Sequence, residues 1–281
     1  SFHQEAARFN RCLGCLMIIV HKPSLASPPG EGAFLDRHAL GKGEAIPADA
    51  IWIDMVEPTR EEDHQIETFL GIDIPTRDEM QDIEPSSILY MENSARYMTA
   101  RILCHSDTQT PNLVPISFIL TEKALVTVRY DEPRSFINFA TRAVKPGGCG
   151  HQPEAVLDGL IETIIDRAAE ILRRVGDEIE QTSRTVFEAD AATADRGAGF
   201  QNVIRRLGRH GDLISNVRES MVSLERMLLS LDQYAKAETG RRFPGGVAHS
   251  GARRAVDRGT CLVSVQQDAV RARCDAGPRQ P

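Results

Sequence analysis

Two long runs of apolar residues at steps of three and four positions constrain the fold of this 281-residue chain more than any other feature. The first run extends from Leu157 to Val186 and the second from Phe200 to Leu231. Such spacing gathers apolar side chains on one side of an α-helix, and both runs follow a heptad. Heptads predict helices that pack with a left-handed supercoil, and the connector at 189–199 is long enough for the two to run antiparallel. We therefore expect a long helical hairpin over residues 151–236.

The residues before this hairpin predict a mixed β-sheet domain flanked by helices, over residues 17–150. Strand patterns occur at 17–20, 51–55, 97–104, 113–121 and 124–130, and the short link between the last two favours a β-hairpin. Thr59 and Glu62 form a capping box for a helix that Gly71 ends, and Thr76 with Glu79 repeats the pattern. Pro133 begins a further helix, and the glycine-rich loop at 146–150 ends this half of the chain. The expected fold class is α+β or α/β, followed by long antiparallel coiled-coil helices.

The two ends of the chain do not follow these patterns. Residues 1–16 carry no fold signal, and we expect them to be a leader or an upstream addition. Residues 239–281 contain eight arginines, three aspartates and neither lysine nor glutamate, so they carry +5 of a total net charge of −7 and leave −12 on the first 238 residues. An arginine-rich, lysine-free composition fits an out-of-frame reading of GC-rich DNA. We therefore expect that the tail at 237–281 comes from a shifted reading frame and is not part of the native fold.

Composition and motifs exclude several classes of function. The acidic net charge argues against a nucleic-acid binder, which needs a basic surface. The longest unbroken apolar run, Cys15–Val20, is far shorter than the roughly 20 residues of a membrane-spanning helix. The six cysteines form neither a disulfide framework nor a zinc motif, so we expect reduced, unpaired thiols. Cys104 and His105 are adjacent in a strand and point to opposite faces, and no other nucleophile–base pair indicates an enzyme.

An excess of carboxylates marks the segment from Asp54 to Glu92. It contains twelve acidic residues and only two basic ones, Arg60 and Arg77. Two interpretations stay open. The acids can be solvated helix faces and favourable partners of helix N-termini, or they can form a surface that attracts divalent cations, which prefer oxygen ligands. His210 lies on the seam of the second helical run, where a seam residue is expected rather than a metal ligand.

Several segments, taken in order, resemble the CorA-type divalent-metal transporter family. They are WIDMVEPT at 52–59, LGIDIPT at 70–76, DEM at 78–80 with the serine pair 86–87, SFILT at 117–121 with LVTVRY at 125–130, and ESMVSL at 219–224. The resemblance covers about residues 17–234, and the combined order is far more specific than any single segment.

The resemblance implies a homopentameric, channel-like transporter of Mg²⁺ (and Co²⁺) in the bacterial inner membrane, with this portion on the cytoplasmic side. In such proteins an α/β domain leads into stalk helices and two C-terminal membrane spans with a Gly-Met-Asn motif, and this chain contains neither spans nor motif. The alignment places Glu79 and Glu162 near carboxylates that hold regulatory metal ions between protomers. A zinc transporter of the same superfamily and a soluble, oligomeric coiled-coil interaction module are the alternatives.

Overall fold

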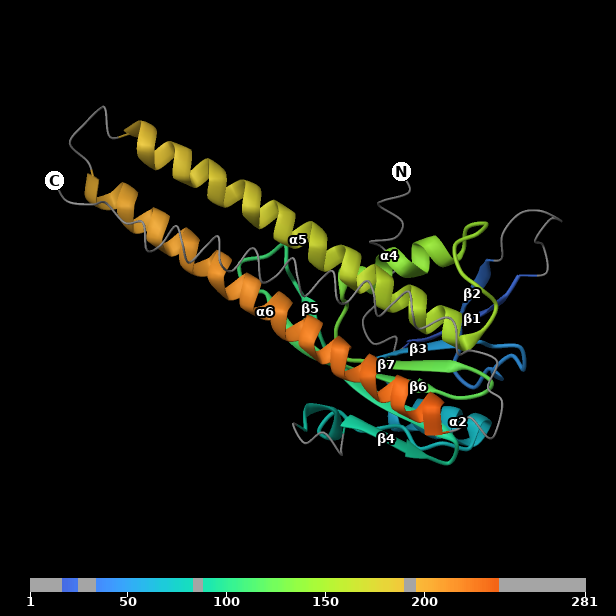
Figure 1. The fold of residues 1–281 in the computed structure, drawn as a ribbon. Helices are drawn as coiled ribbons and strands as arrows, with labels where there is room; N and C mark the ends of the chain where they lie inside the picture. Colours follow the sequence, from blue (N-terminus) through green and yellow to red (C-terminus); the bar gives the residue numbers. More distant parts are fainter. Residues whose placement is uncertain (1–16, 25–33, 83–87, 190–195, 238–281) are drawn as a thin grey trace.

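Three layers make up the computed structural model, which describes residues 17–24, 34–82, 88–189 and 196–237. A seven-stranded sheet forms the middle layer, two short helical elements cover one face, and three helices cover the other (Figure 1). The two long helices run antiparallel and extend well beyond the sheet. The leader at 1–16 and the arginine-rich tail lie outside the described residues, except that Ala237 ends the last helix.

The sheet is mixed, as the sequence predicts. Its strands are β1 (Met17–Pro23), β2 (Leu35–Ala39), β3 (Trp52–Val56), β4 (Leu89–Glu92), β5 (Ala95–Cys104), β6 (Asn112–Leu120) and β7 (Leu125–Arg129). They lie side by side in the order β2-β1-β3-β7-β6-β5-β4. Only β3 and β7 pair in parallel, so this junction joins two antiparallel groups of strands.

The central strands confirm the sequence prediction, and the two edge strands were not predicted. Strands β3, β5, β6 and β7 match the expected ranges within two residues, and β6 and β7 form the expected antiparallel hairpin. Edge strand β2 exposes every residue after Leu35, and its sequence has no alternating apolar pattern that would predict a strand. Edge strand β4 has no fully buried residue. Both edge strands take their conformation from pairing with a neighbour, which a local pattern does not reveal.

Local capping explains the short helices on one face. In α2 (Arg60–Leu70), Thr59 and Glu62 form the predicted capping box, and Gly71 ends the helix with φ 70° and ψ 36°. The predicted helix after Thr76 is wrong in type, because between Thr76 and Asp82, where the described segment ends, the structure has the short 3₁₀ turn η1 (Glu79–Gln81). Asp82, the last residue described in this segment, already has an extended backbone.

The two long helices lie where the sequence predicts them. They are α5 (Pro153–Ala189) and α6 (Arg196–Ala237), and the shorter α4 (Arg134–Ala143) follows Pro133 as expected. The predicted apolar positions are buried from Leu157 to Ile179 in α5 and from Ile214 to Leu231 in α6. Both buried stripes also include residues outside the heptad, such as Leu160 and Met227, because the helices pack on the sheet as well as on each other. Left-handed supercoiling remains a prediction.

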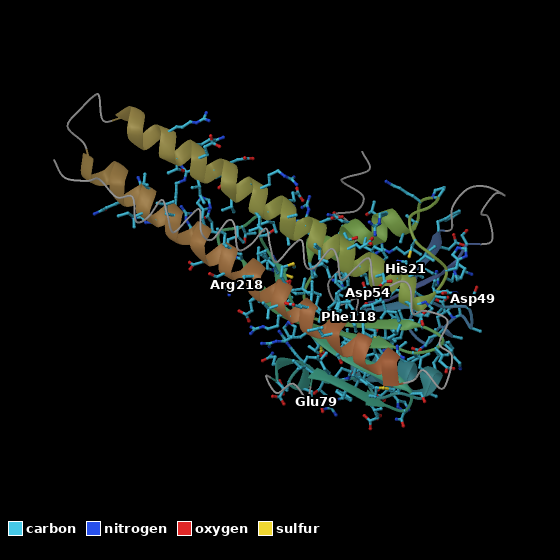
Figure 2. All side chains as sticks on the ribbon, viewed as in Figure 1. His21, Asp49, Asp54, Glu79, Phe118 and Arg218 are labelled. Atoms are coloured by element: carbon cyan, nitrogen blue, oxygen red, sulfur yellow. The ribbon has the colours of Figure 1, made fainter. Side chains whose placement is uncertain are left out.

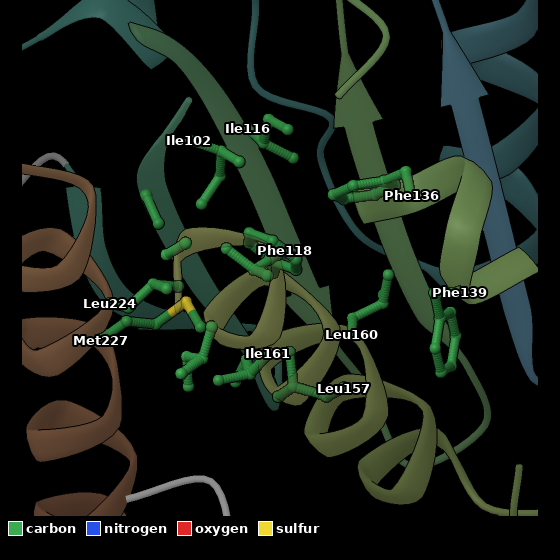
Figure 3. Packing of buried hydrophobic residues seen from close by; sticks show 14 of the residues in the cluster. Ile102, Ile116, Phe118, Phe136, Phe139, Leu157, Leu160, Ile161, Leu224 and Met227 are labelled. Atoms are coloured by element: carbon green, nitrogen blue, oxygen red, sulfur yellow. The ribbon is translucent and has the colours of Figure 1, made fainter. Parts of the chain in front are cut away.

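Side-chain alternation along the strands divides the core into two clusters. On β6, Ile116 and Phe118 face the long helices, whereas Ile119 faces α2. The larger cluster fills the space between the sheet and α4, α5 and α6, with Phe118 and Ile161 near its centre (Figure 3). The smaller cluster lies under α2 and η1. The sheet therefore presents a thick, helix-covered face and a thinly covered face.

Candidate metal site

An acidic pocket opens on the thinly covered face, between η1 and strands β4, β5 and β6. Its volume is about 390 Å³. Three carboxylates, two tyrosines, two hydroxyl residues and one proline line it: Glu79, Asp82, Glu92, Tyr90, Tyr97, Thr99, Ser117 and Pro75. Among the described residues, the side chains that line the pocket therefore offer oxygen donors and aromatic rings and no nitrogen or sulfur ligand.

Glu79 is held in this pocket by the turn that precedes it. The backbone N–H and the hydroxyl of Thr76 donate to Glu79 Oε2 over 2.7 and 2.8 Å, and the N–H of Glu79 donates to Thr76 Oγ1 over 3.4 Å. The predicted reciprocal capping contacts are therefore present on a 3₁₀ turn. Glu79 Oε1 accepts no hydrogen bond from the residues that the structure describes, and the side chain is exposed at the pocket (Figure 2).

A pair of stacked tyrosines forms the aromatic part of the pocket. Tyr90 and Tyr97 face each other across β4 and β5, with ring centroids 4.5 Å apart and planes inclined by 4°. The hydroxyl of Tyr97 donates to the carbonyl of Asp73 over 2.9 Å and accepts from its N–H over 3.1 Å. These two bonds fix the loop before Thr76 on the sheet, so Tyr97 indirectly positions Glu79.

The pocket has a negative electrostatic field. Burial, opposed by the hydrogen bond with the Asp73 backbone and assisted by the charges of Asp73 and Glu92, raises the pKa of Tyr97 to about 12. Burial, followed by the charges of Glu92, Glu79 and Asp73, also raises the pKa of Tyr90. Deprotonating either phenol would add negative charge where carboxylates already concentrate it. The same field favours cations, and hard divalent cations prefer carboxylate and hydroxyl oxygens.

Within one protomer, the pocket does not complete a coordination sphere. Among residues 17–24, 34–82, 88–189 and 196–237, no group of three or more histidine, cysteine, aspartate or glutamate residues is close enough to hold a metal ion. Mg²⁺ commonly keeps several water ligands and uses one or two protein carboxylates. The donor set present here fits such partly hydrated binding.

The structure places Glu162, the second predicted site residue, on the opposite side of the sheet. Glu162 is exposed on α5, between the buried Ile161 and Thr163. Glu79 belongs to the layer of α2 and η1 and Glu162 to the layer of long helices, so one protomer does not bring them together.

The acidic residues between Asp54 and Glu92 include examples of both predicted roles and of a third one. Asp54 is buried on β3, where Arg129 donates to both of its oxygens and Thr127 donates to Oδ1 over 2.8 Å. Glu62 caps α2, and Glu67 Oε1 accepts from the N–H of Ile74. Asp54 is therefore a structural ion-pair partner and not a solvated acid. Exposed acids such as Glu79 and Glu92 remain available to a cation.

Sequence reasoning missed the tyrosine pair. Asn93 and Ser94 both have positive φ, 48° and 63°, and form the two-residue turn between β4 and β5. Asparagine at such a turn is the usual hairpin signal, and it places Tyr90 opposite Tyr97. Residues 93–94 were therefore the local signal that could have revealed the pair.

The remaining candidate groups are structural. His210 is buried on α6, 3.5 Å from the Glu178 carboxylate of α5, which agrees with a seam position. Cys104 and Cys149 are free and buried, and burial raises the pKa of their thiols to about 12 and about 11. A thiol with such a pKa is a poor nucleophile at neutral pH. The other four cysteines lie outside the described residues.

Among the described residues, none of the helices is both long and apolar enough to cross a membrane.

Comparisons with known proteins agree with the fold and with the sequence resemblance. A family model described as "CorA-like Mg2+ transporter protein" matches residues 47–242. A relative from Pasteurella multocida, "Magnesium transport protein CorA", is 25% identical over 179 residues, which cover 64% of this chain and 55% of the relative. The chain thus spans about half the length of the curated relatives it matches.

Two solved structures share the fold at low sequence identity. The soluble domain of CorA from Methanocaldococcus jannaschii matches with a TM-score of 0.59 and 12% identity, covering 92% of this chain and 95% of that one. The cytoplasmic domain of ZntB from Vibrio parahaemolyticus matches with a TM-score of 0.51 and 10% identity, covering 92% and 98%. The fold is therefore shared with the soluble domain of CorA and with the cytoplasmic domain of ZntB.

Proposed function

The chain belongs to the CorA-like Mg²⁺ transporter family, and on that premise we propose that it forms the metal-sensing and gating portion of a divalent-cation transporter. The proposed cargo and regulatory ion is Mg²⁺, with Co²⁺ as a second substrate. The proposed location is the cytoplasmic side of a bacterial inner membrane. No enzymatic role is proposed.

The acidic pocket is the single observation that carries the sensing role. The described side chains of its lining offer oxygen donors alone, with Glu79 fixed by Thr76 and with one carboxylate oxygen available. Oxygen-only donors favour Mg²⁺ over Zn²⁺, which is more often held by cysteine and histidine. This difference supports magnesium over the zinc alternative that the ZntB likeness keeps open.

A homo-oligomer, a pentamer by family resemblance, would give Glu162 a role in the same site. Glu79 and Glu162 lie on opposite layers of one protomer, so a ring of identical protomers can bring Glu79 of one copy toward Glu162 of the next. A bound cation between them would neutralise like charges and hold neighbouring protomers together. Loss of the cation would leave mutual repulsion, and the helices would separate.

Protection from proteolysis tests this sensing role. In the unmodified protein, millimolar Mg²⁺ should slow cleavage, and Glu79→Ala and Glu162→Ala should each abolish that protection. Glu79→Gln, which keeps a hydrogen-bond acceptor for Thr76, separates lost charge from a lost cap. Glu61→Ala on α2 and Asp177→Ala on α5 are matched exposed controls and should keep the protection. Unchanged protection in the two site variants removes Glu79 and Glu162 from the proposal.

Calorimetry distinguishes the three candidate functions. Mg²⁺ binding that is weakened by Glu79→Gln supports the magnesium sensor. Tighter binding of Zn²⁺ than of Mg²⁺ favours the zinc transporter. No binding of Mg²⁺, Co²⁺ or Zn²⁺ favours an oligomeric interaction module. Native mass spectrometry of the same samples measures the oligomeric state and its dependence on the cation.

A further inference from the structure

The tip of the β5–β6 hairpin leaves the sheet and meets both long helices. The two strands are paired without interruption from Arg96 and Leu120 to Cys104 and Asn112, so they form a continuous ribbon. One end of this ribbon carries Tyr97 and Thr99 into the acidic pocket. The other end is the hairpin tip, residues 105–111, which lies beside α5 and α6 (Figure 1).

Two arginines of α5 converge on one carboxylate of the tip. Arg167 Nη2 donates to both oxygens of Asp107, over 2.8 and 2.7 Å, and Arg174 Nη1 donates to Asp107 Oδ1. The same arginines bind Ser106, whose carbonyl accepts from Arg174 Nη2 over 2.8 Å. The bond from Arg174, followed by the charge of Arg167, lowers the pKa of Asp107. Two arginines of α5 that lie seven residues apart in the sequence therefore both bind the hairpin tip.

Helix α6 also contacts this ribbon, through the hairpin tip and the edge of β5. Arg209 donates to the side-chain oxygen of Gln109, and the backbone N–H of Arg101 donates to Ser223 Oγ over 2.9 Å. Arg101 also forms an ion pair with Glu219 over 2.9 Å. Strand β4 pairs with β5 only as far as Met98, so beyond that point α6 provides the partner for the open edge of β5.

The contacts of the tip are almost entirely polar. Asp107, Thr108, Gln109 and Thr110 are exposed, and no residue of the tip belongs to the large apolar core that includes both long helices. The Asp107 side chain is 42% exposed and that of Arg174 39%, whereas that of Arg167 is 12% exposed, so solvent and salt reach the ion pairs from the Asp107 side and weaken them more than they weaken apolar packing. The tip can therefore dissociate from the helices while the sheet and the core remain folded.

We propose that the β5–β6 hairpin tip is an electrostatic latch, closed by Asp107 on Arg167 and Arg174, that fixes the helical arm to the sheet. When these contacts break, the part of α5 and α6 that extends beyond the sheet can move relative to the sheet, and the sheet itself stays folded. The latch goes beyond the proposed metal sensing and exists independently of it. Its regulatory meaning rests on that function, because β5 joins the acidic pocket to the latch directly.

Hydrogen–deuterium exchange of the full chain, in buffer without divalent cations, tests the latch. The amide of Arg101, bonded to Ser223, and the amide of Thr108, bonded to the His105 carbonyl, report on it within a peptide covering 99–112. Asp107→Asn should speed exchange in this peptide and at 205–218 by about ten-fold, since charge-assisted bonds are lost at an exposed site. Exchange in α2 should not change. Arg184→Met is the matched control, because the ion pair of Arg184 among the described residues is with Glu180 of its own helix.

Two further measurements sharpen the result. In 1 M NaCl the unmodified protein should approach the exchange of Asp107→Asn, and the variant should barely respond, because salt screens exposed charges. Arg174→Met added to Asp107→Asn should accelerate exchange by less than the sum of the two single effects, since both remove the Arg174–Asp107 contact and the double variant further loses the bond from Arg174 to the Ser106 carbonyl. Unchanged exchange at 99–112 in Asp107→Asn overturns the latch. Equal acceleration in α2 also overturns it, because the effect is then global destabilisation. Neither result depends on metal binding, so failure of the sensing proposal leaves this test intact.

Discussion

The two faces of the sheet treat their charged residues differently. On the face covered by the long helices, acids are paired with arginines, as in Asp54 with Arg129 and Asp107 with Arg167. On the face covered by α2 and η1, Glu62, Glu67 and Glu79 are held mainly by backbone N–H groups. Arginine pairing neutralises a carboxylate, whereas a backbone N–H orients it and leaves its charge in place. On the face covered by the long helices, ion pairs therefore stabilise the fold. On the face covered by α2 and η1, the carboxylates keep a negative charge that a cation can bind.

The largest expected effect tests the face covered by the long helices. Arg129→Met leaves the Asp54 carboxylate buried with Thr127 as its main remaining partner, since both side chains of the ion pair are only 5% exposed. Breaking a buried pair in this way should lower the free energy of unfolding by about 3–5 kcal/mol. Urea denaturation measures the change.

Arg77→Met is the control from the opposite face. Arg77 is exposed and lies 5.1 Å from the centre of the Tyr130 ring, so its removal should cost less than about 1 kcal/mol. Equal losses in the two variants would contradict the distinction between the faces.

A buried histidine gives the next largest effect, also on the helix-covered face. His21 is 1% exposed and stacks on Trp52 at 4.0 Å, and its ring nitrogens have no hydrogen-bond partner among the described residues. Burial lowers its pKa from 6.5 to about 4. The folded state resists protonation, so its contribution is complete above pH 6.5 and is lost as the pH falls toward 4, at most about 3 kcal/mol.

Comparison of two variants isolates this histidine. Denaturation between pH 4 and 7 should show a shallower pH dependence in His21→Phe than in the unmodified protein. His64→Phe, on the exposed surface of α2, should keep the original dependence. The same slope in both variants would show that other groups cause the acid sensitivity.

The smallest effect tests the thinly covered face. Burial, followed by the charges of Glu67 and Glu62, raises the pKa of Asp63 to about 6. An acid with a raised pKa stabilises the fold while protonated, and that contribution is lost as the pH rises through 6. Asp63→Asn should therefore stabilise the protein by about 1 kcal/mol at pH 7.5, after allowance for solvent screening, and by progressively less toward pH 4.

Glu61→Gln in the same turn of α2 is the control. Glu61 is exposed, so its replacement should change the free energy of unfolding by less than about 0.5 kcal/mol at either pH. If the gain in the free energy of unfolding of Asp63→Asn does not decrease on acidification, the ionised form of the Asp63 carboxyl is not the cause of the gain.

Sequence patterns predicted the elements whose signal lies in their own residues. The capping box of Thr59 and Glu62, the Gly71 helix end, the central strands and both long helices follow from local chemistry. Strands β2 and β4 did not, because edge strands depend on hydrogen bonds to a neighbour. Helix propensity after Thr76 was overridden within one turn, so Glu79 sits on a 3₁₀ element.

The candidate site was predictable only in part. The acidic excess and the family resemblance indicate Glu79 from the amino-acid sequence alone. The stacked tyrosines and the division of Glu79 and Glu162 between two layers depend on strand register and on packing over the sheet. Such relations join residues distant in sequence, and no local periodicity carries them.

The parallel junction of β3 and β7 also governs the order in which the chain can fold. Residues 52–56 pair with residues 125–129, more than seventy positions later, whereas β5, β6 and β7 pair with near neighbours. Closing so long a loop is slow compared with forming a hairpin. During synthesis, one edge of β3 stays unpaired until β7, which ends at Arg129, has left the ribosome. The parallel pairing of β3 with β7 and the Asp54–Arg129 ion pair can form only after that point. The step most exposed to misfolding is therefore the joining of the two antiparallel halves.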